Sequence, residues 1–136
     1  MADPFVQSLK LEENVFELEE DTMVSYLIHL AAPYTDADGI LVKKGTRFYP
    51  TGPMRDDAMY MRETEENREL KDRMIEQLIE NDRSLYPRLM GFSFYITEEE
   101  LKTWKLKFIS GSREYVEQAF ERIRTRNRGY MGGTTN

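Results

Sequence analysis

The chain has 136 residues, of which 40% are hydrophobic, and this length and composition predict one globular domain rather than a disordered chain. It contains no cysteine, which excludes disulfides and cysteine metal sites, and no apolar run long enough to predict a membrane-spanning helix. The net charge of −6, from 25 acidic and 19 basic residues, argues against a domain built mainly to bind nucleic-acid phosphates.

Acidic and basic residues are unevenly distributed along the sequence. Residues 3–21 hold seven acidic residues and one lysine, whereas the chain from Arg122 onward holds four arginines and no acidic residue. Such asymmetry is typical either of solvated ends or of a part with two neighbours of opposite charge. Residues 5–20 predict a short strand or an arm that lies on a partner. We therefore expect an acidic arm over residues 1–20, one α+β domain over residues 21–127 and a flexible tail over residues 128–136.

The first amphipathic element is a helix predicted over residues 21–32. Its buried stripe would consist of Met23, Val24, Leu27, Ile28 and Ala31. Ser25 and His29 lie on the opposite face of this helix. A catalytic pair would also need an orienting group and oxyanion donors, so we interpret His29 as a surface or packing residue. Residues 33–39 follow as a loop with an Asp-Gly turn.

Two short apolar runs, residues 40–42 and 47–49, flank a basic turn and predict a tight hairpin or a strand and turn. The turn contains Lys43, Lys44, Gly45, Thr46 and Arg47. Gly45 supplies the positive φ that a turn of this kind requires. The basic cluster suits a phosphate group, but no helix follows it as in a phosphate-binding loop, so a structural turn is favoured.

A rigid loop and a second helix are predicted next. The loop consists of Pro50, Thr51, Gly52 and Pro53, and core-filling methionines follow it at Met54, Met59 and Met61. The helix begins at the capping residue Thr64, and its apolar stripe consists of Leu70, Met74, Ile75, Leu78 and Ile79. Pro87 disfavours helical geometry at Tyr86, so the helix should end before a kink over residues 85–89.

Two runs with a period of two follow the kink, over residues 92–97 and 104–108. In the second run Trp104, Leu106 and Phe108 alternate with Lys105 and Lys107. We expect the two runs to pair as an antiparallel hairpin. A last helix should begin after the capping residue Ser112, with a stripe made of Tyr115, Val116, Ala119, Phe120 and Ile123. The predicted fold is α+β: amphipathic helices packed on a small antiparallel sheet, in the order helix–hairpin–helix–β-hairpin–helix.

The order of these elements over residues 21–124 resembles the baseplate wedge or sheath-initiator proteins of contractile phage tails, whose relatives include the small baseplate subunit of type VI secretion systems and proteins labelled lysozyme-like. Four features match in order: the first amphipathic helix with the basic turn, the aromatic, proline and glycine segment 48–52, a helix that ends in Tyr86-Pro87-Arg88, and two alternating strands with a terminal helix. Tyr86 stands where the family has glutamate in its Glu-Pro-Arg signature, and residues 34–40 resemble an insertion.

The resemblance implies a structural subunit that links the wedge core to the first sheath ring and accepts a strand from another subunit. It implies partner contacts at Tyr86, Pro87 and Arg88 and a strand-addition edge formed by Trp104, Lys105, Leu106, Lys107 and Phe108. Lys105 and Lys107 would discourage indiscriminate pairing while permitting an acidic partner. The implied partners are baseplate wedge subunits and the tail sheath protein, in several copies around a ring, in a virion baseplate assembled in the host cytoplasm or in a cytoplasmic secretion system. The resemblance implies no catalytic residue, metal, cofactor or membrane contact.

Two other functions fit parts of the sequence. A small nucleic-acid-associated regulator would use Arg122, Arg124, Arg126 and Arg128, with Tyr130 stacking on a base. The acidic remainder of the chain opposes this function. A glycan-cleaving enzyme would need two carboxylates across a cleft, one of them with a raised pKa. The glutamates lie in charged runs, and no such pair stands out.

Overall fold

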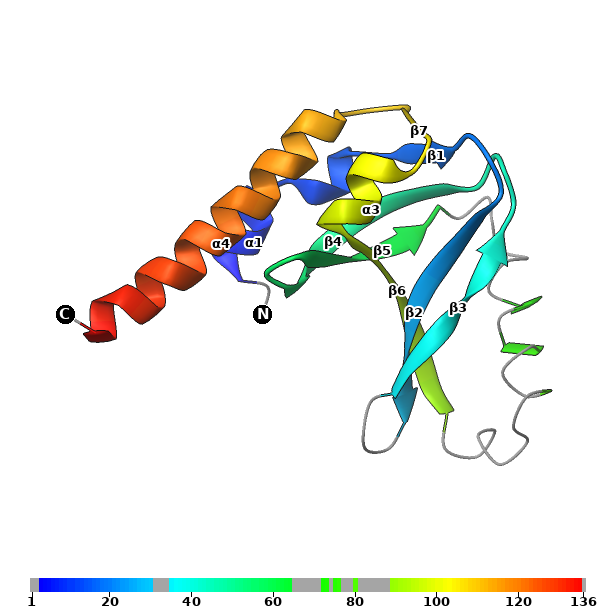
Figure 1. Cartoon of the computed structure of the whole chain (residues 1–136), viewed down its shortest axis with the longest axis horizontal. Coiled ribbons are helices and arrows are strands. Elements are labelled where there is room, and N and C mark those ends of the chain that lie inside the picture. Colours follow the sequence, from blue (N-terminus) through cyan, green and yellow to red (C-terminus); the bar gives the residue numbers. More distant parts are fainter. Residues whose placement is uncertain are drawn as a thin grey trace.

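The computed structural model contains one seven-stranded antiparallel sheet with three α-helices and one 3-10 helix among the described residues (Figure 1). The strands are β1 (Phe16–Leu18), β2 (Thr22–Leu30), β3 (Thr35–Val42), β4 (Arg47–Arg55), β5 (Ala58–Glu63), β6 (Leu89–Thr97) and β7 (Leu106–Phe108). They lie in the order β3-β2-β6-β5-β4-β1-β7. The helices are α1 (Pro4–Ser8), η1 (Leu11–Glu13), α3 (Glu98–Thr103) and α4 (Arg113–Thr135). The chain is therefore of the mixed α+β class.

The structure describes residues 3–30, 35–64, 72–73, 75–76, 80 and 89–135. Within these ranges, residues 28–30, 35–38, 89–92 and 129–135 are described by their backbone alone.

One face of the sheet carries the core, and α3 and α4 pack against it (Figure 1). Alternate residues of the strands point into this core, for example Val24 and Tyr26 of β2 and Phe94 and Ile96 of β6. The helices contribute Leu101, Val116, Ala119, Phe120 and Ile123. All are at most 7% exposed, so the main stabilising term is apolar surface removed from water.

The predicted helix over residues 21–32 is wrong, because residues 22–30 of this segment form β2. Thr22, Val24 and Tyr26 are buried while Met23 is 55% exposed, which is the alternation of a strand. β2 pairs with β3 on one side and β6 on the other. Over a segment as short as β2, the apolar positions are compatible with a helix and with a strand. The segment forms a strand because it pairs with β3 and β6.

The predicted pairing of residues 92–97 with residues 104–108 is also wrong. A short helix, α3, separates them, and β6 pairs with β2 and β5. β7 lies at the far edge of the sheet and pairs with β1. The alternation is confirmed where side chains are described: Phe94 and Ile96 are buried in the first run, and in the second run Leu106 is 7% exposed while Lys105 and Lys107 point into solvent.

Two predicted loops are strands instead. β3 begins at Thr35, inside the predicted loop 33–39, and the predicted rigid loop 50–53 lies within β4. β4 accommodates Pro50 and Gly52 through irregular register between these two residues. The residues that flank the basic turn do not pair with each other, because β3 and β4 are separated by three strands in the sheet.

The last helix and the turn geometry are confirmed. α4 runs from Arg113 to Thr135. Residues 128–135, which the sequence predicted as part of a flexible tail, are therefore the last residues of this helix. Gly45 has a φ of 94°. Most of the predicted helix between Thr64 and the kink lies outside the described residues; its described residues 72, 73, 75, 76 and 80 are helical.

The acidic N-terminal segment contains a strand, which is the first of the two alternatives that the sequence left open. Leu9, Leu11, Phe16 and Leu18 are all at most 2% exposed and belong to the core. β1 lies between β4 and β7 and pairs with both. Glu17 lies between the buried residues Phe16 and Leu18 and pairs with Arg47, while Glu12, Glu13, Glu19 and Glu20 are exposed, so an acidic composition is compatible with a core strand.

Candidate strand-addition edge

β7 is one of the two edge strands of the sheet, and its backbone hydrogen bonds define which groups face outward. The Glu19 amide donates to the Lys105 carbonyl at 2.9 Å, and the Ile109 amide donates to the Val15 carbonyl at 2.8 Å. Hydrogen-bonded pairs alternate along an antiparallel ladder, so Lys107 also faces β1. The backbone groups of Leu106 and Phe108 therefore point away from β1.

Within the described part of the chain, neither Leu106 nor Phe108 has a hydrogen-bond partner for these outward backbone groups. Leu106 is 7% exposed, whereas Phe108 is half-buried and Ile109 is 42% exposed. Phe108 thus offers the more accessible pair of backbone groups. An amide and a carbonyl at an exposed edge are the groups that an added strand uses.

The predicted edge residues do come together in the structure, although Trp104 and Lys105 precede the strand itself. Trp104 packs against the core and Leu106 is part of it. Lys105 lies 3.7 Å from the Glu20 carboxylate at an exposed position. Lys107 forms no ion pair with any residue that the structure describes.

The basic turn lies at the end of β1, next to this edge. The Gly45 amide donates to the Leu18 carbonyl at 2.9 Å, and the Lys44 amide donates to the Asp21 carboxylate at 2.8 Å. The Thr46 amide donates to the Lys43 carbonyl at 3.2 Å. These three amides are engaged within the protein, so they are not free to bind a phosphate group. This supports the prediction of a structural turn.

Other predicted site residues are not part of this edge. Pro50 and Gly52 lie in β4, and Gly52 is close to Val6 of α1, where an added Cβ would lie 3.6 Å from the valine methyl group. Tyr86, Pro87 and Arg88 lie outside the described residues. Of the predicted sites, the strand-addition segment 104–108 therefore lies at an accessible edge of the sheet. The proline-glycine segment is part of the interior strand β4.

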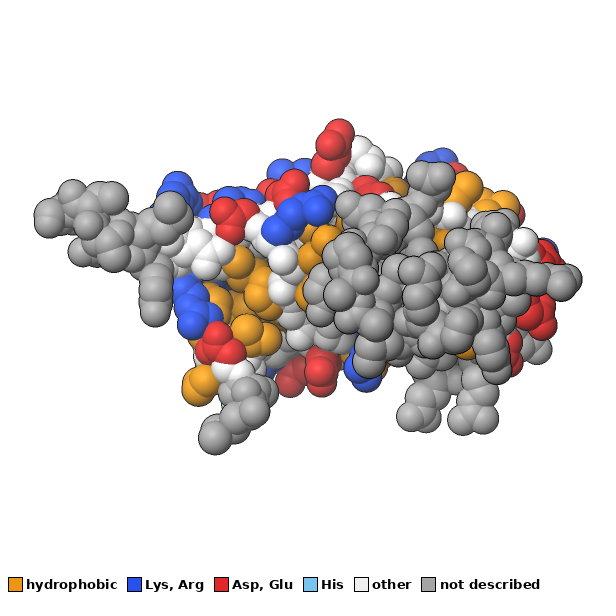
Figure 2. All heavy atoms as spheres, turned by 90° about the horizontal axis from the view of Figure 1, so that it is seen from below, with side chains coloured by type: hydrophobic (Ala, Val, Ile, Leu, Met, Phe, Trp, Pro, Cys, Tyr) orange, Lys and Arg blue, Asp and Glu red, His pale blue; other side chains and the backbone are white. Residues whose placement is uncertain are grey.

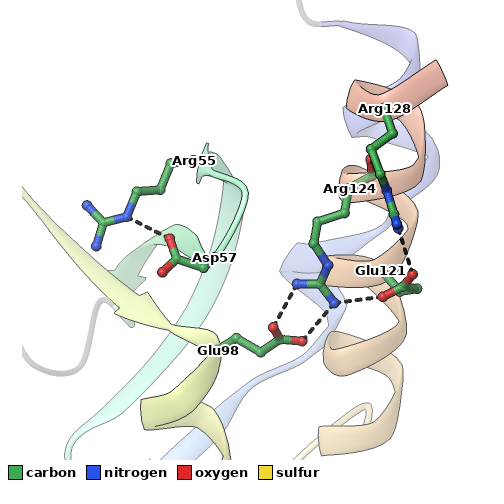
Figure 3. Close-up of polar contacts among 6 residues, drawn as sticks. All are labelled: Arg55, Asp57, Glu98, Glu121, Arg124 and Arg128. Carbon is green, nitrogen blue, oxygen red and sulfur yellow. Dashed lines mark hydrogen bonds and ion pairs between the residues drawn. The ribbon is translucent and has the colours of Figure 1, made fainter. Parts of the chain in front are cut away.

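The C-terminal arginines are largely engaged in ion pairs within the molecule. Arg124 binds the Glu98 carboxylate through two hydrogen bonds of 2.7 and 3.2 Å and binds Glu121 at 2.7 Å (Figure 3). Arg128 also contacts Glu121, at 3.1 Å (Figure 3). Arg126 binds the Asp3 carboxylate at 2.8 Å. These pairs connect α4 to α3 and to the start of α1.

The remaining arginine of this group, Arg122, lies over the ring of Phe5 with its guanidinium carbon 5.8 Å from the ring centre. Arg126 lies closer to the same ring, at 4.4 Å. Both contribute to an open hollow of about 560 Å³ between α1 and α4. Figure 2 shows hydrophobic side chains at the surface between basic and acidic ones on this side of the molecule. The arginines thus hold the first helix against the last.

These contacts weaken the nucleic-acid alternative. Binding to phosphates requires lysines or arginines whose charge is available to the ligand. Arg124, Arg126 and Arg128 are each neutralised by a carboxylate of the same chain. An approaching phosphate would have to compete with these carboxylates, so this surface has little free positive charge.

The enzyme alternative is weakened by the same ion pairs. Glu98 and Glu121 line a hollow of about 440 Å³, but Arg124 lies between them. The hydrogen bond from Arg124 lowers the pKa of Glu121, with the nearby charge of Arg124 as a further cause. A general acid for glycan cleavage needs a raised pKa. The described residues contain no group of three or more metal-binding side chains.

Acid should weaken the contact between the two ends of the chain. Hydrogen bonds, first from Arg126 and then from the Phe5 amide, lower the pKa of Asp3 from its ordinary value of 3.8. Lowered carboxylate pKa values contribute stability above the unfolded-state pKa, and this stability disappears as pH falls through the folded-state pKa. We expect the free energy of unfolding to begin to fall below about pH 5 and to keep falling as the pH passes through the lowered folded-state pKa values. Urea unfolding at several pH values measures this change. In Asp3→Asn and in Glu121→Gln, the free energy of unfolding should decline less with falling pH than it does in the unsubstituted protein.

Sequence reasoning missed Asn14, which connects the two halves of the edge region. Asn14 is 2% exposed; its side-chain amide donates to the carbonyls of Lys10 and Leu11, and its side-chain oxygen accepts from the Ser112 amide, all at 3.2 Å. Residues 14 and 112 are distant in the sequence, so no local pattern reveals this contact. Asn14 fixes the start of β1 next to the end of β7.

Comparisons with known proteins identify no relative. No family model matches the chain, and no curated protein or solved structure matches it either. None of the helices among the described residues is long and apolar enough to cross a membrane.

Proposed function

We propose that this protein is an assembly subunit that binds another chain by adding a strand to the edge of β7. The observation that carries the proposal is the pair of outward-facing backbone groups at Phe108, next to the exposed side chains of Lys107 and Ile109. The structure offers no comparably arranged catalytic group among the described residues. A binding function therefore uses the geometry better than a catalytic one.

We further propose that the assembly is a contractile-tail baseplate, in which the protein links the wedge core to the first sheath ring. This part of the proposal is supported by the resemblance in the sequence. The basic turn and the terminal helix of that resemblance are present. Its first helix is a strand, and Tyr86, Pro87 and Arg88 lie outside the described residues. Wedge subunits and the sheath protein are the proposed partners.

The length of β7 limits the strength of a single contact. Leu106 and Phe108 together offer two amides and two carbonyls, and each hydrogen bond contributes about 0.5–1.5 kcal/mol net. The sum, about 2–6 kcal/mol before the entropy cost of association, corresponds to weak binding by one copy. Repetition around a ring raises the effective concentration of each further contact and makes the assembly stable. A short edge is therefore suited to a subunit that is present in several copies.

Hydrogen exchange tests the proposal directly. Particles isolated from the cells that produce the protein should protect the amides of Leu106 and Phe108 relative to the isolated chain. Core amides such as Phe94 serve as the control, because their exchange should not change. The proposal fails if the protein is absent from tailed particles, or if the β7 amides exchange equally fast in both states.

A further inference from the structure

The strands next to β7 show which side chains this edge accepts. On the solvent-facing side, Arg47 of β4, Glu17 of β1 and Lys107 of β7 lie in one row across the sheet. The Arg47 guanidinium lies 3.1 Å from the Glu17 carboxylate. Charge therefore alternates along the row, and it ends at the edge on a lysine that has no ion-pair partner in the described part of the chain.

The core-facing side has a row of aromatic rings in the same three strands. Phe48, Phe16 and Phe108 lie opposite one another, with ring centroids 6.3 and 5.5 Å apart. Phe48 and Phe16 are fully buried, but Phe108 is only half-buried because no strand lies beyond it in the sheet. An apolar side chain on an added strand would cover this ring.

On its inner edge, β7 already pairs with a strand in which an acidic residue lies between two apolar ones. Phe16, Glu17 and Leu18 of β1 lie opposite Phe108, Lys107 and Leu106. Rows of residues continue across a sheet from strand to strand, so an added strand meets the same three side chains. Opposite charges directly across a strand pair are stabilising, and like charges are destabilising.

From these rows we infer that the strand accepted by β7 has the pattern apolar–acidic–apolar, with the acidic residue opposite Lys107. This inference rests on the strand-addition function proposed above and names the chemistry of the partner segment. The pattern reads the same in both directions, so it suits a parallel or an antiparallel partner. A second acidic residue beyond the pattern would lie opposite Lys105, which is already near Glu20.

Two peptides of equal length test the inference. The peptide Val-Phe-Glu-Leu-Glu repeats residues 15–19, and its charge-reversed partner is Val-Phe-Lys-Leu-Lys. NMR titration of the full chain should show that the acidic peptide protects the Phe108 amide and binds about tenfold more tightly than the basic one. The preference should fall several-fold in Lys107→Gln, whose side chain is uncharged and whose backbone is unchanged.

The outcomes separate the two proposals. Equal protection of Phe108 by both peptides would overturn the charge pattern while leaving strand addition in place. Protection by neither peptide would overturn the strand-addition function together with the pattern. Loss of protection at the Glu19 amide would show that the peptide replaces β1, and this would overturn the assignment to the outer edge. A preference that persists unchanged in Lys107→Gln would show that Lys107 does not select the partner.

Discussion

Replacing Phe16 by alanine is expected to lower the free energy of unfolding by about 3–5 kcal/mol, the usual cost of removing a buried phenylalanine side chain. Phe16 is fully buried and lies between the rings of Phe48 and Phe108. Its removal leaves a cavity in the middle of this aromatic row. Urea unfolding followed by the fluorescence of Trp104, the single tryptophan, measures the change.

Phe5 provides a matched control for this substitution. It also lies in the acidic N-terminal segment, but it is only half-buried and packs at the margin of the core beneath Arg126. Phe5→Ala should cost about 1 kcal/mol. Similar small losses for both variants would contradict the placement of β1 in the core and would instead suit an arm that is only loosely attached.

The sequence predicted the faces of several elements correctly, because burial imposes a local period. Val116, Ala119, Phe120 and Ile123 share one face of α4, and these four residues are buried. Leu106 and Lys107 lie on opposite faces of β7, as a period of two requires. Periods of this kind depend on neighbouring residues alone, so they can be read without knowledge of the fold.

Strand pairing could not be predicted in the same way. β7 pairs with β1, whose residues lie about ninety positions earlier in the chain, and no property of either short strand specifies the other. The predicted hairpin joined the two nearest alternating runs instead. The resemblance implied a strand-addition edge at residues 104–108, and β7 is an edge strand of the sheet, but its neighbour is β1 and not the strand that the sequence predicted.

Two errors could have been reduced by closer attention to local chemistry. Thr97 and Glu100 form a capping box at the start of α3, in which the Glu100 amide donates to the Thr97 hydroxyl and the Glu100 carboxylate accepts from the Thr97 amide. This spacing is visible in the sequence and predicts a helix. β2, in turn, is rich in β-branched and aromatic residues such as Val24 and Tyr26, which favour a strand over a helix.

Replacing Gly111 by alanine is expected to destabilise the protein by about 2–4 kcal/mol, since a buried hydrogen-bonded contact and an unusual backbone conformation are disturbed together. Gly111 has a φ of 67°, which disfavours a residue with a Cβ. A Cβ at this position would overlap the side-chain oxygen of Asn14 and lie 2.9 Å from its Cα. Asn14 would have to move, and its hydrogen bond from the Ser112 amide would be lost.

Gly45→Ala separates the two causes. Gly45 also has a positive φ, of 94°, but no atom lies within 4 Å of an added Cβ, so this variant should lose only about 1–2 kcal/mol from backbone strain. Urea unfolding of both variants and of Asn14→Ala completes the comparison. The double variant Gly111→Ala/Asn14→Ala is measured as well. If Gly111→Ala acts by displacing Asn14, this double variant should lose less stability than the sum of the losses in Gly111→Ala and Asn14→Ala. Additive losses, or equal losses for the two glycine variants, would show that the contact between Gly111 and Asn14 does not hold β1 beside the end of β7.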